Sequence, residues 1–118
     1  LTDRERVLGD DHPATLTSRN NLAYAYRSAG RLSEAIPLYE RALTDSDRVL
    51  GADHPATLTS RNNLAYAYRS AGRSCEAIPL YERALTDSER ILGPDHPITR
   101  VIRGNLASLG GETVPPLP

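Results

Sequence analysis

The sequence predicts an all-α protein, a right-handed superhelical array of antiparallel helix pairs, and three observations favour this fold. Residues 1–42 and 43–84 are two copies of one unit, identical at 37 of 42 positions. Apolar residues recur at helical spacing inside each unit, and no strand-like alternation persists. Gly and Asp-His-Pro interrupt the units at fixed places. A period of this size is typical of stacked repeats rather than a single globule.

The interruptions divide the chain into five segments. Residues 1–8 differ from residues 43–50 at only two positions, so we interpret them as the end of a preceding helix. Two full repeats are expected at residues 9–50 and 51–92, and a terminal half repeat at 93–110. Residues 111–118 are Pro-rich and are expected to form a flexible tail. Because the sequence starts inside a repeat, we expect it to be a fragment of a longer protein.

The first helix of each repeat is expected from Pro13 to about Ala29, with equivalents at residues 55–71 and 97–109. The Asp before each His-Pro is expected to accept the free N–H groups of the first turn, and Pro fits that turn. Gly ends each of these helices, and Gly110-Gly111 is expected to end the last. One face carries apolar residues spaced i, i+3, i+4 and i+7, namely Leu22, Ala25, Tyr26 and Ala29.

The second helix is expected from Leu32 or Ser33 to about Leu50, and again over residues 74–92. Its apolar face has a period of 3.6 residues over four turns. Pro37 lies about one turn in, where it removes at most one backbone hydrogen bond and bends the helix rather than breaking it. The apolar face consists of Ala35, Leu38, Tyr39, Ala42, Leu43, Val49 and Leu50.

Composition and charge exclude several classes of function. The 14 basic and 15 acidic residues are interspersed and give a net charge of −1, which disfavours nucleic-acid binding. Every apolar run is far shorter than the roughly 20 residues that cross a membrane. A single cysteine forms no internal disulfide and favours a reducing, cytoplasmic setting.

No motif indicates an enzyme, a metal site or a cofactor. The sequence has no Gly-rich phosphate loop, no CxxC and no HExxH. His12, His54 and His96 share one repeat position next to Pro, so we interpret them as structural or capping residues rather than metal ligands. Cys75 replaces the Ser33 of the first copy and has no neighbouring base in the sequence, so we interpret it as a surface residue.

The positions just described resemble the tetratricopeptide repeat (TPR), an α-solenoid family. Its Leu, Ala or Gly, Tyr, Gly, Ala, aromatic and Ala positions match Leu22, Ala23, Tyr26, Gly30, Ala35, Tyr39 and Ala42, and again Leu64, Ala65, Tyr68, Gly72, Ala77, Tyr81 and Ala84. The 42-residue unit, with NNLA, EA-x-P-LY and RAL, is similar to kinesin light chain repeats and to arrays of bacterial signalling and regulatory proteins. Arg19 and Arg61 depart from the family, which has an aromatic residue there.

The resemblance implies a non-catalytic protein-interaction scaffold whose first helices line a concave groove. Polar and aromatic side chains of those helices point away from the core and recur in both repeats. Asn can pair with a peptide backbone, Tyr offers apolar area, and Arg can bind a carboxylate. Alternatively, Asn and Tyr only form hydrogen bonds between repeats. The candidate partner-binding residues are Thr17, Asn20, Asn21, Tyr24, Arg27, Thr59, Asn62, Asn63, Tyr66 and Arg69.

The terminal half repeat is more apolar than its predecessors, at Ile98, Val101 and Ile102. One interpretation is a cap with adjusted packing against the preceding repeat. The other is a contact for a second chain or for the tail. The near-identical repeats also allow head-to-tail stacking. A homo-oligomerising structural module is therefore the alternative to a groove that binds a peptide or partner protein.

Overall fold

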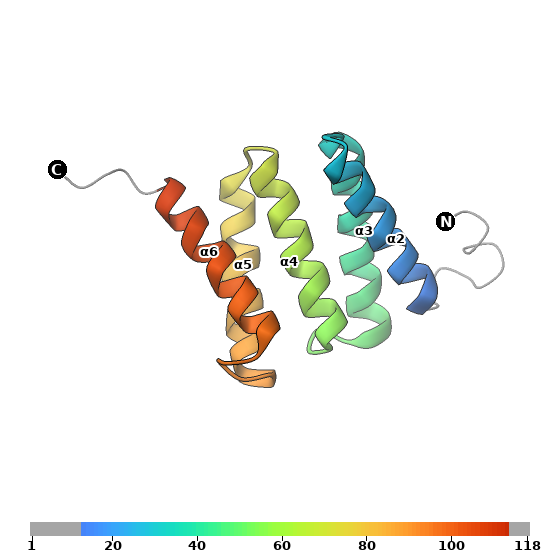
Figure 1. The fold of residues 1–118 in the computed structure, drawn as a ribbon. Helices are drawn as coiled ribbons and strands as arrows, with labels where there is room; N and C mark the ends of the chain where they lie inside the picture. The colour runs from blue at the N-terminus through green and yellow to red at the C-terminus, as the bar shows by residue number, and fades with distance from the viewer. Residues whose placement is uncertain (1–12, 114–118) are drawn as a thin grey trace.

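The computed structural model describes the backbone of residues 13–113 and the side chains of residues 18–109. This part of the chain contains helices and no strand, as the sequence predicts (Figure 1). The expected helix at residues 1–8 and most of the expected tail lie outside the described residues. The helices are α2 (Pro13–Ser28), α3 (Leu32–Leu50), α4 (Pro55–Ser70), α5 (Ser74–Ile91) and α6 (Pro97–Thr113).

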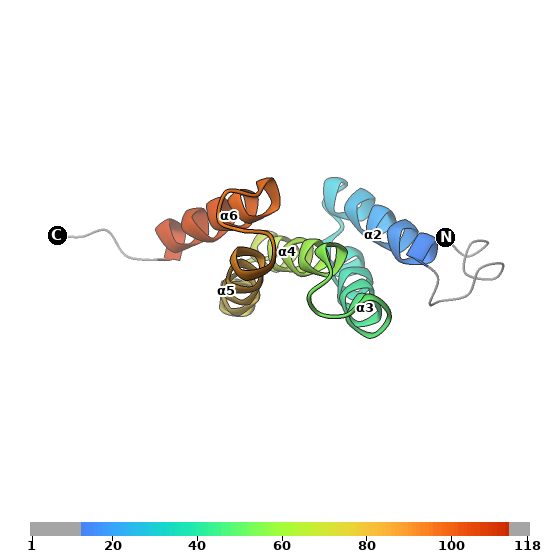
Figure 2. The ribbon, with the colours of Figure 1, turned by 90° about the horizontal axis from the view of Figure 1, so that it is seen from below.

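The helices form two layers. Each helix packs against the next one along the chain, and α4 also contacts α6. Figure 2 shows α2, α4 and α6 along one side of the molecule and α3 and α5 along the other side. In that view α4 is set back relative to α2 and α6, so the three first helices form a concave wall.

Small residues allow the layers to approach closely. Ala23, Ala35 and Ala42 have no exposed surface, and neither do their equivalents Ala65, Ala77 and Ala84 in the second repeat. Tyr39 and Tyr81 fill the remaining space and are at most 1% exposed. Alanine loses almost no side-chain entropy when it is buried, and its small side chain lets helix backbones lie near each other. The predicted face of the second helix is therefore confirmed at its Ala and Tyr positions.

The predicted face of the first helix is confirmed at three of its four positions in the second repeat and less fully in α2. In α4 the equivalents Leu64, Ala67 and Tyr68 are buried. In α2, Ala25 is exposed, because α2 has no described helix on the side where α3 covers α4. Ala29 and its equivalent Ala71 both follow the helix end and are both exposed.

Glycine ends α2 and α4 in the predicted way. Gly30 has φ of 78° and Gly72 has φ of 76°, values that favour glycine. After α2, the Arg31 N–H donates to the Tyr26 carbonyl at 2.8 Å and the Gly30 N–H donates to the Arg27 carbonyl at 3.0 Å. This pair of bonds is a Schellman motif, which satisfies carbonyls left free at the helix end.

The terminal glycines behave differently from the prediction. Helix α6 runs through Gly110 and Gly111 to Thr113 rather than stopping at residue 110. Glycine ends a helix when its backbone adopts positive φ, and neither residue does so here. Within a helix a glycine costs only about 1 kcal/mol relative to alanine, so it does not by itself stop the helix.

The helix starts are capped by histidine rather than by the predicted aspartate. The Ala56 N–H donates to Nδ1 of His54 at 3.0 Å, and the Ile98 N–H donates to Nδ1 of His96 at 3.1 Å. Asp53 instead pairs with Arg90 at 3.1 Å. The capping interpretation of these two histidines is therefore confirmed, whereas the role expected of Asp53 was wrong.

Buried arginines stand where the resembled family has an aromatic residue. Arg19 is 1% exposed and Arg61 is 2% exposed. Nη1 of Arg19 lies 2.6 Å from Oδ2 of Asp45, and Nη1 of Arg61 lies 3.3 Å from Oδ2 of Asp87. Both carboxylates come from the second helix of the same repeat, so an ionic contact replaces apolar packing there.

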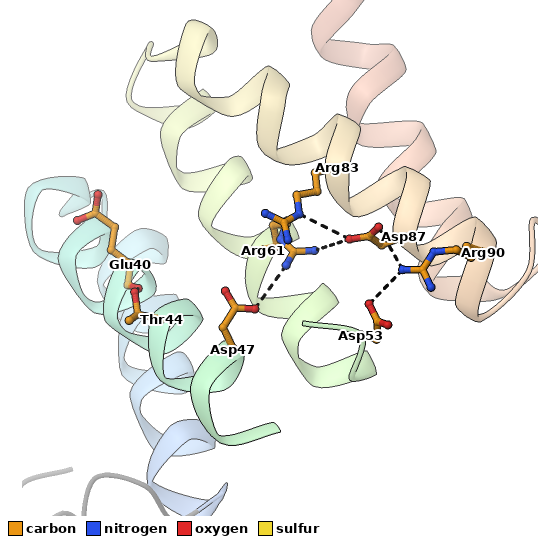
Figure 3. Close-up of polar contacts among 8 residues, drawn as sticks. All are labelled: Glu40, Thr44, Asp47, Asp53, Arg61, Arg83, Asp87 and Arg90. Atoms are coloured by element: carbon orange, nitrogen blue, oxygen red, sulfur yellow. Dashed lines mark hydrogen bonds and ion pairs between the residues drawn. The ribbon is translucent and has the colours of Figure 1, made fainter. Parts of the chain in front are cut away.

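The arginine in the second repeat also reaches back to the first repeat. Nη2 of Arg61 lies 3.5 Å from Asp47 on α3, close enough for an ion pair but not aligned for a hydrogen bond. Arg83 and Arg90 approach Asp87 from its own helix at 3.7 and 3.4 Å (Figure 3). This network joins α3, α4 and α5 behind the concave wall.

Candidate functional site

The candidate residues lie in the first-helix layer, as the sequence predicts. Asn21, Tyr24 and Thr59 are exposed, and the others whose side chains are described are half-buried. The Thr17 side chain lies outside the described residues. Tyr24 is 56% exposed and, with Val101, is one of two large apolar side chains most open to solvent in the described part.

Tyrosine and arginine side chains form a ladder across the wall. The Arg27 guanidinium lies 4.7 Å from the Tyr24 ring centre and 4.4 Å from the Tyr66 ring centre, so it links α2 to α4. Arg69 lies 5.8 Å from Tyr66 on its own helix. A cation this close to an aromatic ring is attracted by the electron density of the ring face. We call Tyr24, Arg27, Tyr66 and Arg69 the Tyr–Arg ladder.

The tyrosine of the Tyr–Arg ladder is not repeated in α6. Ser108 stands where the earlier repeats have Tyr24 and Tyr66. Nη2 of Arg69 donates a hydrogen bond to the Ser108 hydroxyl at 3.0 Å, in place of stacking on a third ring. The ladder therefore spans two repeats and ends in a polar contact.

Two buried tyrosines lie near the ladder arginines. The hydroxyls of Tyr39 and Tyr81 have no aligned hydrogen-bond partner among the described residues. Burial raises the pKa of Tyr39, and the nearby Arg27 charge opposes that rise. Burial likewise raises the pKa of Tyr81 to about 12, against the opposing charge of Arg69. The wall is therefore neutral or positive at its base.

The candidate asparagines already form contacts between repeats. Nδ2 of Asn20 donates to the Ser60 hydroxyl at 3.2 Å, linking α2 to α4. Nδ2 of Asn105 donates to Oδ1 of Asn62 at 3.2 Å, linking α6 to α4. For these two asparagines the geometry agrees with the alternative of inter-repeat hydrogen bonding, so a ligand would have to share them.

Charge is segregated between the two layers. In the described side chains, α2, α4 and α6 contain arginine but no Asp or Glu. Every described carboxylate lies on α3, on α5 or in a loop. Arg19, Arg61 and Arg103 pair with carboxylates of those other elements. The helices of the concave wall therefore contribute no negative charge from their described side chains, although the whole chain has a net charge of −1.

A pocket lies between α4 and α6. Its volume is about 190 Å³, and its lining consists of Thr59, Asn62, Pro97, Ile98, Val101 and Ile102. It thus joins two of the candidate groove residues to all three apolar candidates of the terminal half repeat. That these residues line one pocket needed the distance between α4 and α6, which the sequence does not give.

The terminal apolar residues divide by exposure. Val101 is 55% exposed, Ile98 is half-buried, and Ile102 is fully buried. Ile102 belongs to the core with Leu109, so it is not available as a self-association surface. Self-association stays a prediction, and of its three candidate residues only Ile98 and Val101 have exposed surface.

The described residues were also compared with the requirements of a metal site and of a membrane-spanning helix. They contain no group of three His, Cys, Asp or Glu side chains placed to hold a metal ion. Cys75 is a free, exposed thiol in the first turn of α5, and His12 lies outside the described residues. None of the described helices is both long and apolar enough to cross a membrane.

Sequence reasoning missed the buried Arg–Asp pairs. The signal was present as an arginine in the first helix and an aspartate 26 residues later, repeated in both copies. It does not stand out in the sequence because most arginines of a soluble array are expected at its surface.

Comparison with known proteins gives a consistent result. A family model described as tetratricopeptide repeat matches residues 1–45 and 25–86. No curated protein matches the chain.

Three solved structures share the fold. The TPR-like repeats of a protein described as a kinesin light chain of Podosopora anserina give 30% identity and a TM-score of 0.86, over 92% of this chain and 52% of that one. A single-residue variant of the same repeats gives 30% identity and a TM-score of 0.78, over 92% and 51%. BtubC (BKLC) from P. vanneervenii gives 26% identity and a TM-score of 0.76, over 83% and 39%. The chain thus spans about half of the first two structures and less of the third.

Proposed function

The chain belongs to the tetratricopeptide repeat family, and from this premise we propose that its concave wall binds a peptide segment of a partner protein. Repeats of this family are generally protein–protein interaction modules on a non-catalytic scaffold. The observation that carries the proposal is the Tyr–Arg ladder, which presents aromatic surface and positive charge on the wall formed by the first helices.

Several features make this wall suitable for a peptide. Tyr24 offers a large exposed ring, and aromatic and arginine side chains are enriched at protein interfaces. Stacking between Tyr24 and Tyr66 orders Arg27 in advance, which lowers the entropy lost on binding. The described side chains of α2, α4 and α6 include no carboxylate. Carboxylate groups of a partner can therefore pair with Arg27.

A selection experiment tests the proposal. A displayed library of random peptides is selected on the immobilised chain, and the recovered peptides are measured by fluorescence anisotropy. We expect Tyr24→Ala and Arg27→Gln each to weaken binding by about tenfold, the scale of a hot-spot contact. Cys75→Ser is the matched control, because the first repeat carries Ser33 at that position. Equal binding by the parent chain and both wall variants, with circular dichroism unchanged, would reject the groove.

Self-association is the second candidate, and the exposure of Val101 favours it. Sedimentation of the chain at rising concentration decides between the two functions. A dimer that Val101→Asp dissociates supports self-association, and a monomer at all concentrations excludes it. We also propose that the chain is a segment of a larger signalling or regulatory protein. It spans about half the length of the first two solved structures.

A further inference from the structure

The pocket between α4 and α6 has a counterpart in the sequence one repeat earlier, where α4 follows α2. Three of the residues that line the pocket, Ile98, Val101 and Ile102, come from α6 and are branched aliphatics. At the same three repeat positions α4 carries smaller or more polar residues, namely Ala56, Thr59 and Ser60. The terminal half repeat therefore has an apolar lining at a place where the preceding repeat is small and polar.

One of these substitutions also changes the hydrogen bonding at the rim of the pocket. Between α2 and α4, Nδ2 of Asn20 donates to the Ser60 hydroxyl at 3.2 Å. Ile102 stands at the place of Ser60 and offers no acceptor, so Asn62 on α4 does not repeat this bond. Instead, Oδ1 of Asn62 accepts from Nδ2 of Asn105 at 3.2 Å, and Nδ2 of the half-buried Asn62 has no acceptor among the described residues. The rim therefore presents an amide donor that a carbonyl group of a ligand can use.

A positive charge lies beside the pocket. A neighbouring depression on α6 is lined by Pro97, Arg100 and Val101, and the first and last of these also line the pocket. Arg100 is exposed, and its guanidinium has no ion pair or hydrogen bond within the described part of the chain. The other described arginines each contact a carboxylate or an aromatic ring. An acidic group of a partner can therefore pair with Arg100 without displacing a carboxylate of this chain.

The size and lining of the pocket suit one aliphatic side chain. Its volume of about 190 Å³ is below the roughly 300 Å³ at which pockets for drug-sized ligands usually begin. No described aromatic residue lines it, so a ring that entered would find no ring to stack on. Entry of a Leu, Ile or Val side chain is favoured because its apolar surface leaves water.

We propose that this pocket is the subsite for an aliphatic residue of a partner peptide, next to an acidic residue of the same peptide. The aliphatic side chain fills the pocket, the peptide backbone accepts a hydrogen bond from Nδ2 of Asn62, and the acidic side chain pairs with Arg100. The inference rests on the peptide groove proposed above and adds the chemistry of the partner. The subsite lies on α4 and α6, whereas Tyr24 and Arg27 lie on α2, so each can be altered without the other.

An NMR titration tests the subsite apart from the Tyr–Arg ladder. The probe is the capped dipeptide N-acetyl-Leu-Glu-amide. A dipeptide spans about 7 Å when extended, less than the roughly 8–10 Å between the axes of packed helices. We expect shifts of the Ile98 and Val101 methyl signals and of the Asn62 side-chain amide, with an affinity about tenfold higher than that of N-acetyl-Ala-Glu-amide. Unchanged signals at these residues at millimolar probe, or equal affinities for the Leu and Ala probes, overturn the proposal.

Variants of α6 assign the two contacts. Val101→Thr restores the residue of Thr59 at an exposed position and should remove most of the preference for Leu over Ala. Arg100→Gln should weaken binding of the Leu-Glu probe but leave binding of N-acetyl-Leu-Gln-amide unchanged. Ala107→Ser, at an exposed position of the same helix, is the control, and circular dichroism checks that each variant is folded. A preference for Leu that survives Val101→Thr, or an equal loss for both probes on Arg100→Gln, contradicts the assignment.

The outcomes separate this inference from the proposed groove and from self-association. Silent pocket signals, together with selected peptides that Arg27→Gln still weakens, overturn the subsite and leave the groove in place. Dipeptide binding in the pocket, together with selected peptides that ignore Tyr24 and Arg27, rejects the ladder and supports the subsite. Without any probe, the Ile98 and Val101 methyl signals should not depend on protein concentration. A dependence accompanied by a dimer that Val101→Asp dissociates would assign the pocket to a second copy and overturn the proposal.

Discussion

The interior helix α4 and the terminal helix α6 occupy equivalent places 42 residues apart. Their sequences differ, and the kind of substitution depends on the position around the helix. Towards the preceding repeat, Ser60 and Ala67 become Ile102 and Leu109, both fully buried. At another position, the fully buried Leu58 becomes Arg100, which is exposed. Helix α6 therefore gains apolar volume at positions that are buried and gains a charge at a position that is buried in α4.

This difference shows how a stack of near-identical units can end. An interior repeat needs two apolar sides, whereas a terminal unit needs only one and must keep the other compatible with water. Tyr68, which bonds across the repeat boundary, is replaced by Gly110. The substitutions in α6 therefore agree with the cap interpretation, with Val101 as the exception on the concave side.

The largest effect is expected from returning α6 to the sequence of α4 at its docking side. Leu109→Ala restores the residue of Ala67, but it leaves a cavity in the core because α6 has adapted to the larger side chain. We expect a loss of about 3 kcal/mol in the free energy of unfolding, within the range for buried Leu→Ala substitutions. Urea denaturation gives the value. Val101→Ala, at an exposed position of the same helix, is the control and should cost less than about 1 kcal/mol.

Helices α4 and α6 also differ in the surroundings of an arginine that both carry at the same repeat position. Arg61 in α4 is buried between Asp47 and Asp87, whereas Arg103 in α6 forms an ion pair with Glu89 at 3.1 Å at the surface. Arg61→Met should cost about 2–3 kcal/mol, because it removes the buried partner of Asp87 and leaves that carboxylate with only the more exposed Arg83 and Arg90. Arg103→Met should cost less than about 1 kcal/mol, since exposed pairs are weak. Equal losses in thermal unfolding would show that burial does not separate the two sites.

The alkaline range tests the contact that α4 has and α6 lacks. Burial, together with the hydrogen bond to Glu40, raises the pKa of Tyr68 from its usual 10.0 to about 12. The folded chain therefore holds this proton more tightly than the unfolded chain. The resulting stability is complete below about pH 10 and is lost as the pH rises towards 12. Tyr68→Phe should be less stable at pH 8 but should lose less between pH 10 and 12, as measured by urea midpoints.

The sequence predicted the parts of this molecule that depend on local pattern. Repeat length, the helix positions and the Gly turns followed from spacing and backbone chemistry, as Gly30 and Gly72 show. What it could not predict depended on neighbours. The exposure of Ala25 against the burial of Ala67 is invisible in two identical helices.

The candidate site shows the same division. The repeated spacing placed Tyr24, Arg27 and Tyr66 on one wall, where the structure stacks them together. Other features could be found only from the distances between helices. Asn20 and Asn62 form hydrogen bonds between repeats, and Thr59 and Val101 line one pocket. Peptide binding itself stays a prediction.

The smallest effect is expected where α4 and α6 agree. Both begin with a histidine whose Nδ1 accepts a hydrogen bond from the backbone N–H two residues later, at 3.0 Å for His54 and 3.1 Å for His96. Loss of such a cap costs about 1 kcal/mol, so His54→Ala and His96→Ala should lower stability by similar amounts in urea denaturation. Asn is among the best residues at the position before the first turn, and His54→Asn should therefore restore most of the loss. If Asn behaves like Ala, the histidine ring contributes through packing, and the cap is not the reason that both helices begin in the same way.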